Sequence, residues 1–121
     1  KTRHAINAAC VQAKVALVSA AAISFDGQIS VFDHRHADAP CYACLFSPDQ
    51  NFEEVQCSTM GVFSPLVGII GTMQAAEGLK LLMQIGDSLN GRLLMLDVLR
   101  MEWTQVRINK NPHCPVCAQA S

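Results

Sequence analysis

Four of the six cysteines in this 121-residue chain form two pairs, each with the spacing Cys-x-x-Cys. Cys41 and Cys44 lie in "PCYAC", and Cys114 and Cys117 lie in "HCPVC". Four thiolates in tetrahedral geometry suit Zn²⁺, and a site closed by four cysteines has a structural role. The pattern therefore predicts one structural zinc site formed by Cys41, Cys44, Cys114 and Cys117.

Other interpretations of the cysteine pairs stay open at this point. The pairs are too far apart for a compact zinc finger, so the fold has to bring them together. A redox Cys-x-x-Cys motif normally opens a helix, whereas Pro40 precedes one pair and Pro115 lies inside the other. A redox pair and unrelated buried thiols are the alternatives. His34, His36 and His113 could replace a cysteine as ligand, although solvated loop positions are the simpler interpretation.

The two remaining cysteines have different surroundings in the sequence. Cys57 lies in an irregular stretch ahead of a long predicted helix. A thiol near a helix N-terminus is favoured as thiolate and can act as a nucleophile, so Cys57 is a candidate catalytic residue. Cys10 lies on the apolar face of the first predicted helix, and we expect it in the core.

Two polar pairs fall at helical spacing. Arg3 and Asn7 are four residues apart, which places them on one helix face, and an exposed polar patch is the simplest interpretation. Glu77 and Lys80 are three residues apart and are predicted to form an ion pair within their helix.

The composition indicates one globular domain. Half of the residues are hydrophobic, 16% are charged and the net charge is −1, so there is no electrostatic basis for binding nucleic acid or an anionic membrane. The first residues, "KTRHAINAACVQAK", carry charge where a secretory signal peptide needs an apolar core. We therefore expect a cytoplasmic protein whose thiols serve as metal ligands or reactive groups.

Local patterns predict the elements that position these residues. Apolar residues recur at helical spacing over residues 2–13, and residues 15–19 are a short β-branched strand candidate. The stretch "AAISFDGQISVFD" predicts a hairpin with its turn at Asp26-Gly27. Residues 46–60 show no periodicity and are expected to form an exposed crossover loop.

The second half is predicted as a long helix followed by two strands. Ser64 is a candidate N-cap with proline in the first turn, and the helix would run to about Gln84. A turn at Asn90-Gly91 would lead into strands at residues 92–99 and 102–108.

A stripe of small residues runs along the long helix, formed by Gly68, Gly71, Ala75 and Gly78. Each glycine costs about 1 kcal/mol of helix propensity relative to alanine, so we expect another backbone, from a sheet or a partner helix, to approach closely. The helix is apolar enough to be mistaken for a membrane span. Glu77 and Lys80 argue against that, because each charge at mid-bilayer costs about 3 kcal/mol.

In order along the chain, several stretches resemble the E1-like adenylyltransferases of the MoeB, ThiF and HesA group, which resemble the ubiquitin-activating enzymes. The stretches are "TRHAINAAC", "SAAAISFDGQISVF", "PCYACLF", "QCSTMGVFSPLVGIIGTMQAAEGLKLL", "GRLLMLDVLRMEW" and "NPHCPVC". Together they cover nearly the whole chain. Within the group the chain looks most like the MoeB type.

The resemblance implies an enzyme that uses ATP and Mg²⁺ to adenylate the C-terminal glycine of a ubiquitin-like sulfur-carrier protein of the MoaD or ThiS kind. Such enzymes serve molybdopterin or thiamin biosynthesis and are commonly homodimers. By motif match the paired cysteines would bind zinc, and Cys57 falls at the family's reactive cysteine, which some members use for a thioester or persulfide. Arg3 would lie at the edge of the ATP site.

The resemblance also implies a fold class. The family fold is an α/β domain with a Rossmann-like mixed sheet. Residues 1–121 would supply its C-terminal part, with antiparallel strands and the four-cysteine zinc site. The nucleotide-binding half would be absent, so we expect the chain alone to bind ATP weakly and to be inactive. Its uncovered sheet edges are expected to pair with a second copy or with the missing half.

Two other functional classes stay open. A non-catalytic, zinc-stapled module could bind the tail of a ubiquitin-like protein, and a thiol-redox protein is a third alternative. A Gly-x-Gly-x-x-Gly turn encoded upstream of Lys1 would favour the enzyme. Four free, reactive thiols without zinc would favour the redox protein.

Overall fold

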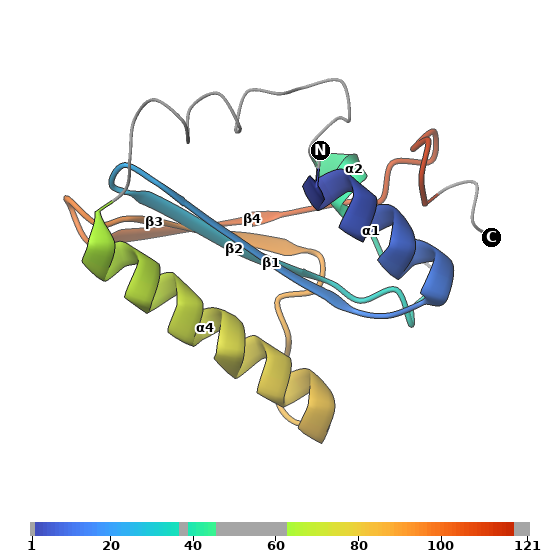
Figure 1. Cartoon of the computed structure of the whole chain (residues 1–121), viewed down its shortest axis with the longest axis horizontal. Helices are drawn as coiled ribbons and strands as arrows, with labels where there is room; N and C mark the ends of the chain where they lie inside the picture. Colours follow the sequence, from blue (N-terminus) through green and yellow to red (C-terminus); the bar gives the residue numbers. More distant parts are fainter. Residues whose placement is uncertain (1, 37–38, 46–62, 118–121) are drawn as a thin grey trace.

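The computed structural model describes residues 2–36, 39–45 and 63–117. Four strands form one antiparallel sheet in the order β1-β2-β3-β4, so each strand pairs with the next along the chain. The elements are α1 (Thr2–Ala13), β1 (Leu17–Ile23), β2 (Asp26–Phe32), α2 (Tyr42–Leu45), α4 (Ser64–Met83), β3 (Arg92–Asp97) and β4 (Glu102–Arg107). The long helix α4 runs along the sheet. Helix α1 lies beside α2 at the end of the sheet that is opposite the β1–β2 turn (Figure 1).

The main core lies between α4 and one face of the sheet. Side chains alternate between the two faces of a strand, and in β2 the alternation places Ile29 and Val31 toward the helix, where both are fully buried. Leu66 and Ile70 of α4 pack with Leu96 of β3 in the same layer. The β-branched and leucine side chains of this layer hold α4 on β1 and β2.

The predicted hairpin is present, but its turn is at Ser24-Phe25 instead of Asp26-Gly27. Asp26 and Gly27 belong to β2, where they pair with Ile23 and Ala22, and Ser24 takes the left-handed conformation with φ 55°. Gly27 has another role: a Cβ there would lie 2.7 Å from Cγ1 of Ile70. The close approach of α4 therefore requires a glycine within the strand.

The long helix matches its predicted range, with a different N-cap. Phe63 is the N-cap residue, with extended backbone and no side-chain capping bond, and Ser64 is already helical. At the other end Gln84 takes the left-handed conformation with φ 57°, and its N–H donates to the carbonyl of Lys80. Glu77 and Lys80 form the predicted ion pair.

The small-residue stripe does not face the sheet. A Cβ added at Gly68, Gly71 or Gly78 would meet no atom within 4 Å. The expectation that the sheet approaches these glycines is therefore wrong. Approach by a partner helix stays a prediction, since no partner chain is part of the structure.

Helix α4 also has the length and hydropathy of a membrane span, with a mean hydropathy of 1.3 over 18 residues, of which 17% are buried. A core helix of a globular domain can reach the same length and hydropathy, although such a helix is mostly buried. Leu66 and Ile70 pack on the sheet, and the helix buries the charged Glu77. These contacts favour the core-helix interpretation among the described residues.

The remaining predicted helix and strands are confirmed, the strands with shifted ends, whereas the crossover loop predicted at residues 46–60 lies outside the described residues. α1 has its predicted bounds, and Gly91 provides the turn before β3 with φ 79°. The strand predicted at residues 15–19 begins two residues later and extends to Ile23. Strand β4 is exposed along its whole length. The sheet described here is antiparallel, and a parallel, Rossmann-like part of the domain stays a prediction.

Candidate metal centre

The fold brings the two cysteine pairs together at the end of the sheet away from the β1–β2 turn. Cys41 comes directly before α2 and Cys44 lies within it, while Cys114 and Cys117 lie in the segment after β4. Together with Val11 of α1, the cysteines form a small buried cluster. Helix α1, which contacts α2, therefore lies along one side of the site.

The sulfur geometry fits a single metal ion. The Sγ atoms of Cys41 and Cys114 are 3.6 Å apart, those of Cys44 and Cys117 are 3.4 Å apart, and those of Cys41 and Cys44 are 4.0 Å apart. All four lie within 4.8 Å of one another. A tetrahedron with metal–sulfur bonds of about 2.3 Å has sulfur–sulfur edges of about 3.8 Å. The described residues thus form a four-cysteine site that could hold a metal.

Backbone N–H groups point at the sulfur atoms. The N–H groups of Cys41 and Asn111 both donate to Sγ of Cys44, each at 3.4 Å. Such bonds stabilise negative charge on sulfur and hold each loop in one conformation. The turns therefore suit thiolates, the form in which cysteine binds a metal.

Burial has the opposite effect on the thiols. It raises the pKa of Cys41 and of Cys117. Burial also raises the pKa of Cys114, but hydrogen bonds from the backbone N–H groups of Cys117 and Val116 outweigh this effect and lower the pKa to about 7. Protein groups alone therefore do not make all four sulfurs thiolates, and a bound cation would supply the missing stabilisation.

The nearby histidines are not part of this sulfur cluster. His36 Nε2 lies 3.6 Å from a carboxylate oxygen of Asp33. The backbone N–H of His113 donates to the side chain of Asn111. Within the part of the chain that the structure describes, the grouped ligands are four cysteines and no histidine.

Asn7 belongs to the site, although the sequence suggested an exposed patch with Arg3. The Asn7 side chain is fully buried. Its Nδ2 donates to Sγ of Cys41 at 3.6 Å, and its Oδ1 accepts from the backbone N–H of Tyr42 at 2.9 Å. Asn7 and Val11 lie four residues apart on the buried face of α1, but the sequence alone gives no signal that this face, rather than the more apolar one, is buried.

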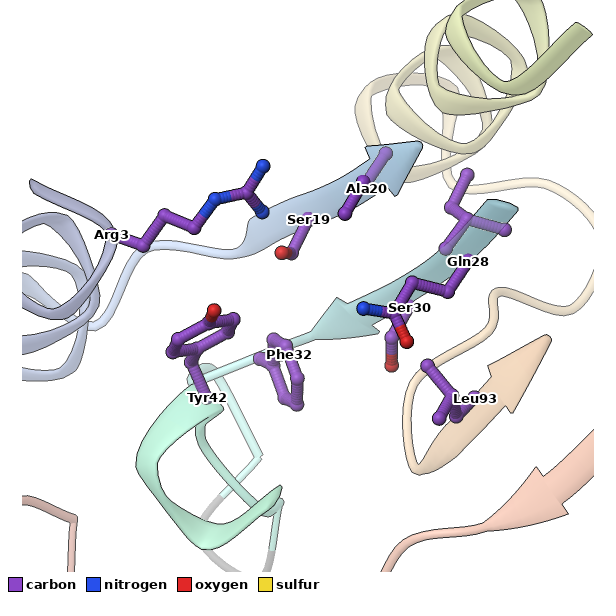
Figure 2. Close-up of a pocket in the computed structure, with 10 residues that line it drawn as sticks. Arg3, Ser19, Ala20, Gln28, Ser30, Phe32, Tyr42 and Leu93 are labelled. Atoms are coloured by element: carbon purple, nitrogen blue, oxygen red, sulfur yellow. The ribbon is translucent and has the colours of Figure 1, made fainter. Parts of the chain in front are cut away.

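Arg3 lies at a small cavity on the sheet face opposite α4. Figure 2 shows its side chain reaching from α1 toward Ser19, with Tyr42 and Phe32 on the other side of the cavity. The cavity holds about 10 Å³, far below the roughly 300–1,000 Å³ of ligand pockets. It does not enclose a nucleotide by itself, so a place for Arg3 at the edge of the ATP site stays a prediction.

A wider cleft of about 400 Å³ lies between the end of α4 and the segment after β2. Its charged groups already have partners within the chain. Arg35 makes two bonds of 2.8 Å to the carboxylate of Asp33, and Lys80 pairs with Glu77 and donates to the carbonyl of Asp87. These pairs reduce the charge available to a ligand.

The predictions for the two cysteines outside the Cys-x-x-Cys pairs differ in how far the structure tests them. Cys57 lies outside the described residues, so its predicted role as nucleophile stays untested. Cys10 is only partly buried, because α1 buries mainly Asn7 and Val11. The expectation that Cys10 lies in the core is met in part.

Comparisons with known proteins agree on one family. The model of the ThiF family matches residues 1–116. The chain is 40% identical over 119 residues to molybdopterin-synthase adenylyltransferase of Salmonella typhimurium, covering 97% of this chain and 46% of that protein. It is 41% identical to a sulfur carrier protein adenylyltransferase of Thermus thermophilus, covering 96% of this chain and 44% of that protein. The chain thus spans about half the length of the curated relatives it matches.

Solved structures share the fold at low sequence identity. Escherichia coli MccB with succinimide superposes with a TM-score of 0.75 at 14% identity, covering 96% of this chain and 36% of MccB. MccB with ATP gives 0.73 at 15% identity, covering 93% and 35%. This likeness concerns the fold alone.

Proposed function

Because the chain belongs to the ThiF family, we propose that it forms part of an adenylyltransferase that activates a ubiquitin-like sulfur-carrier protein. The observation that carries the proposal is the identity of about 40% over nearly the whole chain to proteins named as molybdopterin-synthase and sulfur carrier adenylyltransferases. Molybdopterin biosynthesis is the favoured pathway, with thiamin biosynthesis as the alternative.

The proposed reaction joins a carboxylate to AMP. An oxygen of the carrier's C-terminal glycine carboxylate attacks the α-phosphorus of ATP, and the bond to the β-phosphate oxygen breaks. Pyrophosphate leaves, and an acyl adenylate remains that a sulfur nucleophile can attack. Mg²⁺ would neutralise phosphate charge in this step. The nucleotide would bind mainly to a parallel, Rossmann-like part of the domain, with Arg3 at the edge of its site.

Zinc is the metal we propose for the four cysteines. Its role would be structural, because four cysteine ligands leave no open position for substrate. The metal would join the segment around α2 to the C-terminal turns, two parts of the chain that come from opposite sides of α4 in the sequence. The side chains of Cys41, Cys44, Cys114 and Cys117 would each supply one thiolate.

Further assignments follow from the same family. Cys57 is our candidate for a thioester or persulfide link to the carrier. A homodimer in the cytoplasm is the proposed assembly. The exposed apolar side chains on α4, Val67, Leu79, Leu82 and Met83, support a covered surface there.

The experiment uses the whole protein in which this chain occurs, with MgATP and candidate carrier proteins. Mass spectrometry should show the carrier gaining one AMP, and a carrier without its C-terminal glycine should gain none. Release of pyrophosphate should follow the same pattern. A folded, metal-loaded protein that binds a carrier without forming adenylate would contradict the proposal and favour a binding module.

The role of Cys57 is tested separately in the same system. If Cys57 forms the covalent link, Cys57→Ala should still form the adenylate but lose sulfur transfer. Sulfur transfer at the normal rate in Cys57→Ala would remove Cys57 from the mechanism and leave adenylation unaffected.

A further inference from the structure

Asn7 is a polar side chain in the middle of α1 that is completely buried. Both ends of its amide contact the segment that begins α2. Nδ2 donates to Sγ of Cys41, and Oδ1 accepts from the N–H of Tyr42. A buried amide with both ends satisfied fixes the distance between the two chain segments that it joins.

We propose that Asn7 is the positioning residue that couples the metal centre to α1 and to the cavity beside Arg3. Through its one amide group, Asn7 would fix the position of Cys41, a metal ligand, and of Tyr42, whose side chain lines the cavity. The inference rests on the proposed metal site and adds a residue that the cysteine pattern does not contain.

The chemistry of the sulfur atoms gives Asn7 its first role. Four thiolates around one divalent cation carry excess negative charge, and N–H donors to sulfur stabilise it. Sγ of Cys44 has the backbone donors of Cys41 and Asn111. For Cys41 the side-chain donor is Asn7, whose Nδ2 lies 3.6 Å from Sγ. The Asn7 amide thus supports this ligand from α1, in addition to the backbone of Cys44; burial raises the pKa of Cys41, and these two hydrogen bonds act to lower it.

The orientation of the amide is fixed by its second contact. The Tyr42 backbone N–H can only donate, so it has to face Oδ1, at 2.9 Å. Nδ2 is then left toward Cys41, where it donates to sulfur. In the reverse orientation the amide oxygen would face the thiolate of Cys41, and the amide NH₂ group would face the N–H of Tyr42, so neither hydrogen bond could form. Aspartate at position 7 would keep the contact to Tyr42 and lose the one to sulfur.

Tyr42 extends the coupling to the cavity. Its ring lies 5.0 Å from the ring of His4 and 6.2 Å from that of Phe32, each in an edge-on arrangement. Tyr42 and Arg3 line the same cavity, as Figure 2 shows. A shift of Cys41 on metal loss would therefore move the Tyr42 backbone and, through Asn7, the helix that carries Arg3.

The first test compares Asn7→Asp with Gln12→Glu in the full chain. Gln12 is exposed on the same helix, so the control makes the same change from amide to acid without touching the site. In competition with a chromophoric chelator, Asn7→Asp should bind Zn²⁺ about 10- to 100-fold more weakly, and Gln12→Glu should match the wild type. With Co²⁺ bound, the sulfur-to-metal charge-transfer bands should shift in Asn7→Asp alone.

The second test needs no substitution at the site. Tyr42 is the single tyrosine, so 3-fluorotyrosine gives one ¹⁹F resonance that reports on the cavity wall. Loading with ¹¹³Cd²⁺ should shift this resonance and should produce a scalar coupling between the cadmium and the side-chain N–H of Asn7.

The outcomes separate this inference from the proposed function. A wild-type chain that binds no metal would contradict the metal site itself. Metal binding with equal affinity and equal Co²⁺ spectra in wild type and Asn7→Asp would overturn the role of Asn7 alone. So would a Tyr42 resonance and Asn7 side-chain signals that do not respond to ¹¹³Cd²⁺.

Discussion

Two glycine-to-alanine substitutions should change stability in opposite directions. Gly27 lies in β2 beneath α4, and a Cβ there would lie 2.7 Å from Cγ1 and 2.9 Å from Cδ1 of Ile70. Gly71 lies on the outer side of α4, where a Cβ would meet no atom within 4 Å. The same change of one methyl group thus meets a packed core at one site and open space at the other.

The magnitude follows from these distances. Ordinary contact begins at 3.4 Å, so with a contact at 2.7 Å the neighbour has to move by about 0.7 Å. Ile70 is almost fully buried and cannot turn away, and such overpacking costs about 1–3 kcal/mol. In Gly71→Ala the helix gains about 1 kcal/mol of propensity. The two variants should therefore differ by about 2–4 kcal/mol in free energy of unfolding.

Urea unfolding of the metal-loaded chain, followed by circular dichroism, measures both values. Ile70→Ala should reduce the cost of Gly27→Ala, because it removes the two nearest atoms and leaves Cδ1 of Leu66, at 3.0 Å, as the next nearest, and the double variant should cost less than the sum of the single variants. Gly27→Ala with wild-type stability would refute the close approach of α4. A destabilised Gly71→Ala would show that another surface covers the small-residue stripe, as a partner helix would.

Three further changes probe the polar contacts and the metal. Glu77→Ala removes the acceptor of the Leu89 N–H, bonded at 2.7 Å, and should cost about 1–3 kcal/mol in urea unfolding; a loss below about 0.5 kcal/mol would contradict this role. The hydrogen bond from Arg35 lowers the pKa of Asp33 in the folded state. The carboxylate therefore stabilises the fold at any pH above about 3.9, its pKa in the unfolded chain. This stabilisation is lost as the pH falls through the lower pKa of the folded state. Asp33→Asn should therefore reduce the acid dependence of stability, and an unchanged pH profile would argue against the pair. Chelation of the metal should lower the melting temperature, and more readily at low pH because protons compete for the thiolates; a melting temperature insensitive to chelator would count against a structural metal.

The spacing of the cysteines was sufficient to predict that the four sulfur atoms come together, because two Cys-x-x-Cys pairs point to a shared site whatever fold lies between them; the metal itself stays a prediction. The position of Asn7 could not be predicted, since an asparagine on a helix has the same local pattern whether it faces water or a buried sulfur. Only the contact between α1 and α2 decides between the two. Cys57 and the assembly stay predictions for a different reason, since they depend on parts that the structure does not describe.

The elements were predicted well and the turns less well. Apolar patterns located α1, α4 and the strands, but in α1 the apolar side is not the buried one, because Asn7 and Val11 are buried and Ile6 is exposed. The Asp26-Gly27 pair is a strong local signal for a turn, but α4 requires the absent side chain of Gly27 inside β2. A tertiary contact thus set the register of the hairpin, and the turn fell on Ser24 despite its positive φ.

X-ray absorption at the zinc edge of the purified protein tests the central claim most directly. We predict one zinc per chain with four sulfur neighbours at about 2.3 Å and no nitrogen or oxygen neighbour. A protein without zinc, or with fewer than four sulfurs on the metal, would contradict the four-cysteine centre on which this account of the fold and its coupling to α1 depends.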